Sequence, residues 1–170
     1  MYAFGTIHWR AAGISDRVIG LLWAEGVIAE ILLFLIGGAF MRRIRPADAL
    51  LMAAAGGVLR WAVLGYSTDP LALFAVQGLH ALTFGAAHLG AMAFVARAAP
   101  AGFTATVQSL YNAIGMGAAS ALAIMLAGPL YAAVGGDAFY LMSALSLAGG
   151  AAALVLRRRW DGSRIDLPSG

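Results

Sequence analysis

The chain has 170 residues, of which 62% are hydrophobic and only 11% are charged, and its mean hydropathy is +0.85. All 11 basic residues are arginine, and eight Asp and Glu residues leave a formal net charge of +3. A soluble domain of this size cannot bury so much apolar surface. The composition therefore excludes a soluble globular enzyme, a disordered chain and a nucleic-acid-binding protein. It predicts an integral membrane protein, with the lipid bilayer as its surroundings.

The sequence offers few residues for metal or thiol chemistry. Cysteine is absent, which excludes disulfides, thiolate metal ligands and a cysteine nucleophile. The three His residues are scattered, and no Ser/His/Asp motif is visible. We therefore expect no cofactor, no metal site and no enzymatic activity. Residues 1–17 also lack the basic start and apolar stretch of a cleavable signal peptide.

Apolar runs of about 20 residues, long enough to cross a bilayer as helices, recur between short polar breaks. The expected spans are residues 18–40, 47–66, 71–96, 103–134 and 138–156. The run 103–134 is overlong, so we expect part of it to be loop and Gly128-Pro129 to bend or break it near its end. This pattern predicts an all-α polytopic membrane bundle.

The two ends of the chain differ from these spans. Residues 1–14 are apolar but too short to span, and they resemble the last turns of a helix whose beginning is missing. Residues 161–170 are expected to form a short polar tail.

Arginines in the breaks between spans predict the orientation of the chain. The breaks at 41–46, 97–102 and 157–164 hold eight arginines, whereas the alternate breaks hold two arginines and three aspartates. Arginine-rich loops stay on the cytoplasmic side of a membrane. The C-terminus and the tail are therefore expected in the cytoplasm.

Five ionisable side chains fall inside the expected spans: Glu25, Glu30, Arg60, His80 and His88. A charge at the centre of a membrane helix costs about 2.5–3.5 kcal/mol on insertion scales. Such residues persist where they face a cavity or a partner, and by default they mark a transport path.

Helical geometry places these groups relative to one another. Glu25 and Arg60 have opposite charge and lie at a similar depth, roughly 10 Å from the outer end of their helices. Glu30 and His80 fall near the midplane, and His88 lies closer to the cytoplasmic side. Glu25 and Glu30 are about 140° apart around the helix, which argues against a carboxylate pair.

Other side chains share faces with this group. Trp23 and Glu30 are seven residues apart and therefore lie on one face, two turns apart. Thr83 shares a face with His80, together with Phe84 and Ala87.

Each of these residues also has a purely structural interpretation. Glu30 and both membrane histidines could serve helix packing. Arg60 could form a salt bridge with Glu25, which could instead line a wet vestibule. The aromatic residues of these helices could be anchors at the membrane interface, namely Trp23, Trp61 and Tyr66.

Three motifs in order resemble the major facilitator superfamily. They are IGLLWAxGVxAE at 19–30, LRW at 59–61 and GLHALTFGAxH at 78–88. The closest likeness is to the 3-phenylpropionic acid transporter group and its relatives, the lactose permease and nucleoside symporters. The resemblance implies that residues 1–160 are the C-terminal six-helix half of such a transporter, with its first helix truncated, and that the partner is a missing N-terminal half.

The resemblance also implies roles for single residues. Glu30 falls at the substrate-binding glutamate of lactose permease, Arg60 at its arginine tied to proton coupling, and His80 at the histidine that links substrate and proton sites. Thr83 stands where the family pattern has a protonated glutamate, and Gln77 near a lysine position. A coupling proton would therefore sit on Glu30, on Glu25 or on a carboxylate of the missing half.

The predicted function is secondary active transport, proton-coupled, of a small organic solute such as an aromatic acid or a sugar. Arg60 would meet a carboxylate or tune a proton site, Glu30 would bind or relay a proton, and Trp23 would pack against an apolar ring. The abundance of Ala, Gly and Arg without Lys fits a GC-rich bacterial gene, and the expected location is the bacterial inner membrane. The alternative is a non-transporting membrane subunit, or an inactive half-transporter, that assembles with another chain.

Overall fold

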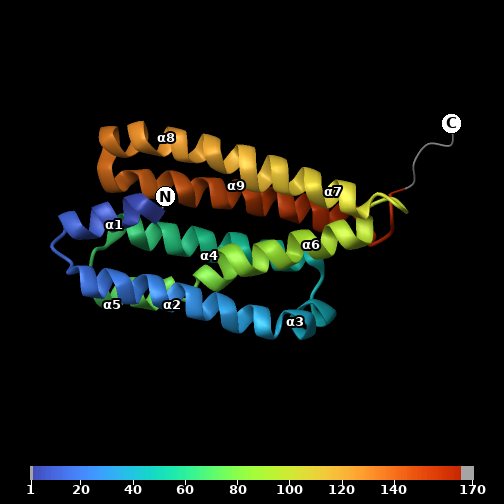
Figure 1. Ribbon diagram of the computed structural model, residues 1–170, viewed down its shortest axis with the longest axis horizontal. Helices are drawn as coiled ribbons and strands as arrows, with labels where there is room; N and C mark the ends of the chain where they lie inside the picture. Colours follow the sequence, from blue (N-terminus) through green and yellow to red (C-terminus); the bar gives the residue numbers. More distant parts are fainter. Residues whose placement is uncertain (1, 166–170) are drawn as a thin grey trace.

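The computed structural model describes residues 2–165, so residues 166–170 of the predicted tail lie outside it. Within the described part, every regular element is a helix. The long helices run nearly parallel to one another along the long axis of the molecule (Figure 1). The predicted all-α membrane bundle is confirmed.

The first expected span is divided into two helices. Helix α1 (Tyr2–Ala11) comes before it, and the span itself forms α2 (Asp16–Leu35) and α3 (Gly37–Arg43), with a break at Ile36. Two glycines follow directly after Ile36, and glycine weakens a helix because it loses much backbone entropy on folding. Arg42 and Arg43 lie in the last turn of α3, where their positive charges interact favourably with the partial negative charge of the helix C-terminus.

Prolines start the next two crossings. Helix α4 (Pro46–Tyr66) and helix α5 (Pro70–Gln77) both have proline in the first turn, where its missing N–H costs nothing. The Asp69 carboxylate caps α5 by accepting a 2.7 Å hydrogen bond from the Leu71 backbone N–H. The crossing continues through a turn at Gly78, a π-helix η1 (Ala81–Ala86) and helix α6 (Ala87–Ala98).

The overlong run is helical throughout. It consists of α7 (Thr104–Tyr111), a π-helix η2 (Asn112–Ala118) and α8 (Ala119–Val134). The expected loop within it was therefore wrong, and Pro129 lies inside α8 rather than breaking it. A helix that crosses lipid satisfies its backbone internally and tolerates proline, because adjustments of neighbouring turns compensate for the lost hydrogen bond.

The last crossing returns antiparallel to α8. The chain reverses at a short 3-10 turn, η3 (Gly135–Asp137), where Gly135 has φ +56°, and continues as α9 (Ala138–Arg159) (Figure 1). Four helical segments of the described chain are long and apolar enough to cross a membrane. One of them, Thr104–Arg159, contains this reversal, so it provides two antiparallel crossings, one that ends with α8 and one formed by α9. The protein is a multi-pass membrane protein.

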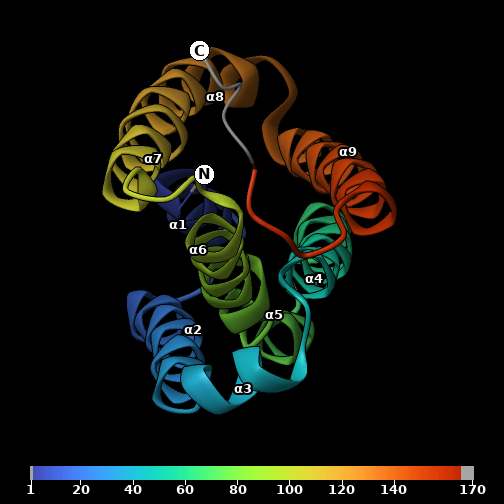
Figure 2. The ribbon, with the colours of Figure 1, turned by 90° about the vertical axis from the view of Figure 1, so that its right-hand side faces the viewer.

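An apolar cluster holds the bundle together at the end that carries α1 and η3. It draws side chains from α1, α2, α4, α5 and α9. Its buried members are Trp9, Ile19, Leu22, Leu64, Leu73, Val76 and Phe139. Seen along the helix axes, α5 and α6 run through the middle of the arrangement, with α2 on one side and α4 on the other (Figure 2).

Helices α4 and α9 pack at very short range. A Cβ atom added to Gly57 of α4 would lie 2.5 Å from the Ser146 Oγ and 2.9 Å from the Ser146 Cβ of α9. Ser143 of α9 donates a 2.9 Å hydrogen bond to the Val58 carbonyl. Small residues that let two backbones approach are the usual means of helix association in membranes.

We therefore expect Gly57→Ala to destabilise the protein by about 1–3 kcal/mol, because the added methyl group overpacks this interface. The measurement is the thermal unfolding midpoint in detergent, which should fall. Gly20→Ala is the matched control, since nothing lies within 4 Å of a Cβ at Gly20 in α2. Equal midpoints for the two variants would contradict the packing argument.

Candidate functional site

A buried polar network connects α2, α4 and the α5–η1 crossing. Arg60 of α4 is 1% exposed, and Gln77 at the end of α5 is fully buried. The Arg60 guanidinium donates to the Gln77 Oε1 from Nε (3.2 Å) and Nη2 (2.9 Å), and from Nη1 to the Thr83 Oγ1 (3.3 Å). The Gln77 Nε2 in turn donates to the Leu22 carbonyl of α2 at 3.2 Å. Gln77 thereby fixes the guanidinium with respect to two other helices.

The break between α5 and η1 explains how Gln77 and Thr83 reach the same guanidinium. On a regular α-helix, residues six apart lie on different faces, at about 100° per residue. Here Leu79 and Leu82 donate backbone hydrogen bonds to residues three earlier, at 3.1 and 3.0 Å. Thr83 itself lies in the π-helix η1, so the segment between Gln77 and Thr83 departs from regular α-helical spacing. This irregular segment lets both side chains bond to Arg60.

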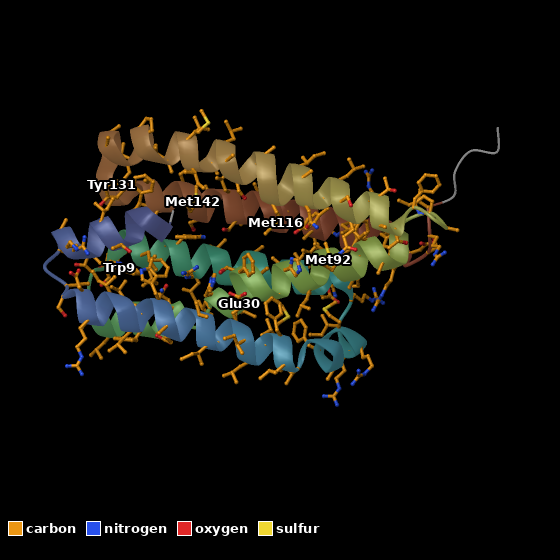
Figure 3. All side chains as sticks on the ribbon, in the orientation of Figure 1. Trp9, Glu30, Met92, Met116, Tyr131 and Met142 are labelled. Carbon is orange, nitrogen blue, oxygen red and sulfur yellow. The ribbon has the colours of Figure 1, made fainter. Side chains whose placement is uncertain are left out.

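Glu30 and His80 form a pair across the interface of α2 with this crossing. The His80 Nε2 lies 3.1 Å from the Glu30 Oε2, and the two side chains are 10% and 19% exposed. Glu30 lies about midway along the long axis of the molecule (Figure 3). A Cβ at Gly26, one turn before Glu30, would lie 3.3 Å from the His80 Cβ, so glycine there allows the two helices to meet.

His80 connects the pair to the arginine network. Its backbone carbonyl accepts a 3.3 Å hydrogen bond from the Thr83 hydroxyl, which itself accepts from Arg60. A continuous chain of contacts therefore runs from Glu30 through His80 and Thr83 to Arg60. Glu30 and His80, which were expected at the same depth, lie in contact, and Thr83 lies beside Arg60, a contact that the sequence did not predict.

Phe84 lies between the two membrane histidines. Its ring is stacked on His80, with centroids 5.8 Å apart, and on His88, with centroids 6.2 Å apart. Phe34 of α2 meets His88 edge-on at 6.3 Å. The Nδ1 of His88 is buried and has no hydrogen-bond partner among the described residues. His88 is thus joined to the site by ring stacking.

Glu25 lies beside the α5–η1 break. Its Oε1 would be 3.6 Å from a Cβ at Gly78, and its Oε2 is buried without a hydrogen-bond partner in the described chain. Glu25 is five residues from Glu30 and faces a different neighbour, as the helical angle predicts.

Trp23 lies toward α1 rather than at the carboxylate. Its indole N–H donates a 3.0 Å hydrogen bond to the Thr6 Oγ1, and its ring is 5.2 Å from that of Trp9. It packs against the apolar cluster. These contacts place Trp23 in the packing of α2 against α1.

A cavity of about 450 Å³ opens beside Arg60, between α4, the η1–α6 segment and α9. Arg60, Trp61, Thr83, Phe84 and Ser146 provide its functional groups. Alanine, glycine and leucine side chains form the rest of the wall: Leu50, Ala53, Ala54, Gly57, Ala87, Gly149, Ala152, Ala153 and Leu156. A mainly apolar cavity with a few convergent polar groups is typical of small-molecule sites.

Aromatic rings lie next to the cation of this cavity. The Arg60 guanidinium carbon is 5.0 Å from the centroid of the Trp61 ring, a distance at which cation–π attraction operates. Trp61 is itself stacked on Phe139, with centroids 6.1 Å apart. The arrangement suits an organic anion that carries a flat apolar group.

The sequence did not indicate site roles for Gln77, Phe84 or Ser146, and Trp61 could be expected either as an interface anchor or as a stacking ring. Gln77 had a signal, because an amide within the apolar run 71–96 needs a buried partner. Phe84 and Trp61 had no such signal, because aromatic side chains are common in membrane spans. In the described chain, no group of three or more His, Cys, Asp or Glu side chains could hold a metal ion.

Comparison with known proteins identifies the family. The model of the MFS_1 like family matches residues 1–142, which include the whole polar network. The chain belongs to the MFS_1 like family. As a member of this transporter family, it has the helical membrane architecture that the resemblance of its motifs predicted.

A curated relative of this MFS_1-like chain is the "Probable 3-phenylpropionic acid transporter" of Escherichia coli (strain K12). The two are 38% identical over 146 residues, which is 86% of this chain and 38% of the relative. The chain therefore spans less than half the length of that relative. No solved structure matches this chain.

Proposed function

We propose that this MFS_1-like chain is the C-terminal half of a proton-coupled secondary transporter for a small aromatic acid, working by alternating access. The observation that carries the substrate class is the cavity that Arg60 lines together with the aromatic residues Trp61 and Phe84. The name of the E. coli relative, which refers to 3-phenylpropionic acid, supports the same class. The proposal includes a bacterial inner-membrane location and a cytoplasmic C-terminus.

The cavity chemistry favours an aromatic acid over a sugar. The Arg60 guanidinium would bind a carboxylate through charge-assisted hydrogen bonds, and the apolar walls would keep that interaction out of water, where it is weaker. The ring of the acid would pack against Trp61 and Phe84. A sugar needs many hydrogen-bonding partners, whereas the hydrogen-bonding side chains among the described residues that line this cavity are Arg60, Trp61, Thr83 and Ser146.

The Glu30–His80 pair is proposed as the proton site. A proton on Glu30 would remove the carboxylate charge that faces the His80 Nε2 at 3.1 Å. The hydrogen bond from Thr83 to the His80 carbonyl, together with that from Arg60 to Thr83, provides a physical link between proton occupancy and the anion site. In this proposal, Trp23 helps to hold α2 against α1 and does not touch the substrate.

Uptake of radiolabelled 3-phenylpropionate tests the function. Cells that contain the whole transporter, of which this chain is the proposed C-terminal half, should accumulate the acid faster as the external pH is lowered, and a protonophore should abolish the accumulation. Cells without the protein correct for passive entry of the neutral acid. Unlabelled 3-phenylpropionate should compete, whereas 3-phenylpropanol, which lacks the carboxylate, and a galactoside should not.

Two results would contradict the proposal. Competition by the galactoside as strong as that by 3-phenylpropionate would exclude the substrate class. Uptake insensitive to pH and protonophore would exclude proton coupling.

The alternative is a membrane subunit that assembles with another chain and does not transport, and the short coverage of the relative keeps it open. The native protein, detected with an antibody to residues 161–170, distinguishes the two. A mass near twice 17.5 kDa is expected for a continuous transporter. A species of 17.5 kDa that copurifies with a partner, without phenylpropionate uptake, would favour the subunit.

A further inference from the structure

A second cavity, of about 300 Å³, lies at the end of the bundle that carries the loop arginines. It shares no lining residue with the cavity beside Arg60. Its lining comes from the beginning of α4, the end of α6, the end of α9 and the segment after α9: Arg45, Pro46, Ala47, Arg97, Arg157, Trp160, Asp161 and Gly162. Three of these eight residues are arginines, each with a guanidinium group.

The charges around this cavity leave a positive excess. Arg157 forms an ion pair with Asp48 at 2.7 Å through its Nε, and the Arg97 Nη2 donates to the Met41 carbonyl at 3.3 Å. Each guanidinium has five N–H donors, so both arginines keep donors for a ligand. Three arginines, Arg45, Arg97 and Arg157, therefore carry positive charge at this cavity, against the two carboxylates of Asp48 and Asp161.

Asp161 is engaged by its own turn. Its carboxylate accepts hydrogen bonds from the Ser163 hydroxyl (2.6 Å) and the Ser163 backbone N–H (2.9 Å), which lower the pKa of the Asp161 carboxyl. Gly162 allows this turn because it has φ +96°, a conformation that other residues rarely adopt. These bonds hold Asp161 as part of the turn that forms the cavity wall.

The segment after α9 is fixed at the boundary between apolar and polar surroundings. The Trp160 ring meets Phe94 of α6 edge-on at 4.9 Å, and its indole N–H donates to the Ser163 carbonyl at 2.9 Å. The Ile165 N–H donates to the Ala98 carbonyl at the end of α6. Tryptophan that is half in apolar and half in polar contact is typical of a membrane–water interface.

We infer that this cavity binds the phosphate headgroup of an anionic phospholipid from the leaflet at the arginine-rich end of the bundle. Guanidinium groups match phosphate oxygens in charge and in bidentate geometry. The cavity lies at the ends of membrane helices beside Trp160, where headgroups lie, and basic pockets between such helices bind anionic lipids. The inference depends on the membrane assignment and not on the transported substrate.

Native mass spectrometry of the full chain in detergent tests this inference. The probes are phosphatidylglycerol, phosphatidylcholine and inorganic phosphate. The double variant Arg45→Gln/Arg97→Gln should retain phosphatidylglycerol at least about tenfold less than the unsubstituted protein, because each arginine contributes to phosphate attraction. Arg158→Gln/Arg159→Gln is the matched control, since it removes the same charge from the same end of the bundle but outside the cavity, and it should retain the lipid.

The single variant Arg45→Gln guards against a folding defect. The Arg45 side chain lines the cavity, and its substitution removes no side-chain hydrogen bond or ion pair to the described residues. It should weaken phosphatidylglycerol retention without lowering the unfolding midpoint in lipid-free detergent. Unchanged retention in this variant and in the double variant would overturn the inference.

The remaining outcomes also decide the question. Equal loss in the two double variants would mean that general charge, and not this cavity, attracts the lipid. Equal retention of phosphatidylcholine would exclude recognition of an anionic headgroup. Displacement of phosphatidylglycerol by equimolar inorganic phosphate would make free phosphate the ligand. Each of these results overturns the lipid site while leaving the transport proposal untouched.

Discussion

Replacing Arg60 by glutamine is expected to lower uptake of 3-phenylpropionate at least about 30-fold, since losing one partner of a buried charged hydrogen bond costs about 2 kcal/mol or more. Glutamine can still bond to Gln77 or Thr83, so the buried amide of Gln77 keeps a polar neighbour. What disappears is the positive charge in the cavity wall. The measurement is initial uptake, corrected for the amount of protein in the membrane.

Arg60→Lys refines this prediction. Lysine keeps the charge but not the planar fork that contacts Gln77 and Thr83. We expect uptake between that of Arg60→Gln and the unsubstituted protein, with the larger change in the half-saturating concentration. Arg158→Gln is the control, because it removes an arginine from the last turn of α9 and should leave uptake unchanged. Full uptake by Arg60→Gln would place the anion elsewhere.

Replacing Glu30 by glutamine is expected to abolish proton-driven accumulation while exchange of labelled for unlabelled substrate continues. Glutamine has nearly the same shape as glutamate and can accept a hydrogen bond from His80, but it cannot take up a proton. Accumulation should lose its response to external pH and to protonophore. Counterflow in membrane vesicles, which needs no net proton movement, is the measurement that separates lost coupling from lost binding.

Glu25→Gln is the matched control for this experiment. It is the same substitution on the same helix, five residues away, at a carboxylate that lies beside Gly78. We expect it to keep proton-driven accumulation. If Glu25→Gln loses coupling and Glu30→Gln keeps it, the proton site is Glu25, and the proposed role of the Glu30–His80 pair is wrong.

The crossings could be predicted from the sequence because bilayer thickness and hydropathy determine them. The starts at Pro46 and Pro70 lie within one residue of the expected ones, since proline and the polar residues before it leave few alternatives. The overlong run was misjudged for the opposite reason. Proline at 129 is a breaker in water, but in lipid an unpaired backbone costs more than an irregular turn, so helix continues from Thr104 to Val134.

Candidate site residues could be selected by the cost of burying charge, but their partners could not. That rule selects Glu30, Arg60 and His80 directly. It gives no information about Gln77 as the partner of Arg60, because that contact joins α4 to the end of α5 and depends on how the two helices pack. Trp23 shares a face with Glu30, yet a tryptophan and a threonine on α1 provide its contacts, and these depend on tertiary packing.

The divided crossing of α5, η1 and α6 has a mechanical consequence. A mid-helix stretch of 3-10 turns followed by a π-helix has poorer hydrogen-bond geometry than a continuous α-helix and often marks a hinge. His80 lies in this stretch. On one side of it, the end of α5 is bound to Arg60 through Gln77. On the other side, Arg97 of α6 donates to the carbonyl of Met41. We therefore expect a rotation of α6 at the arginine-rich end of the bundle to change the backbone around His80 before it moves α5.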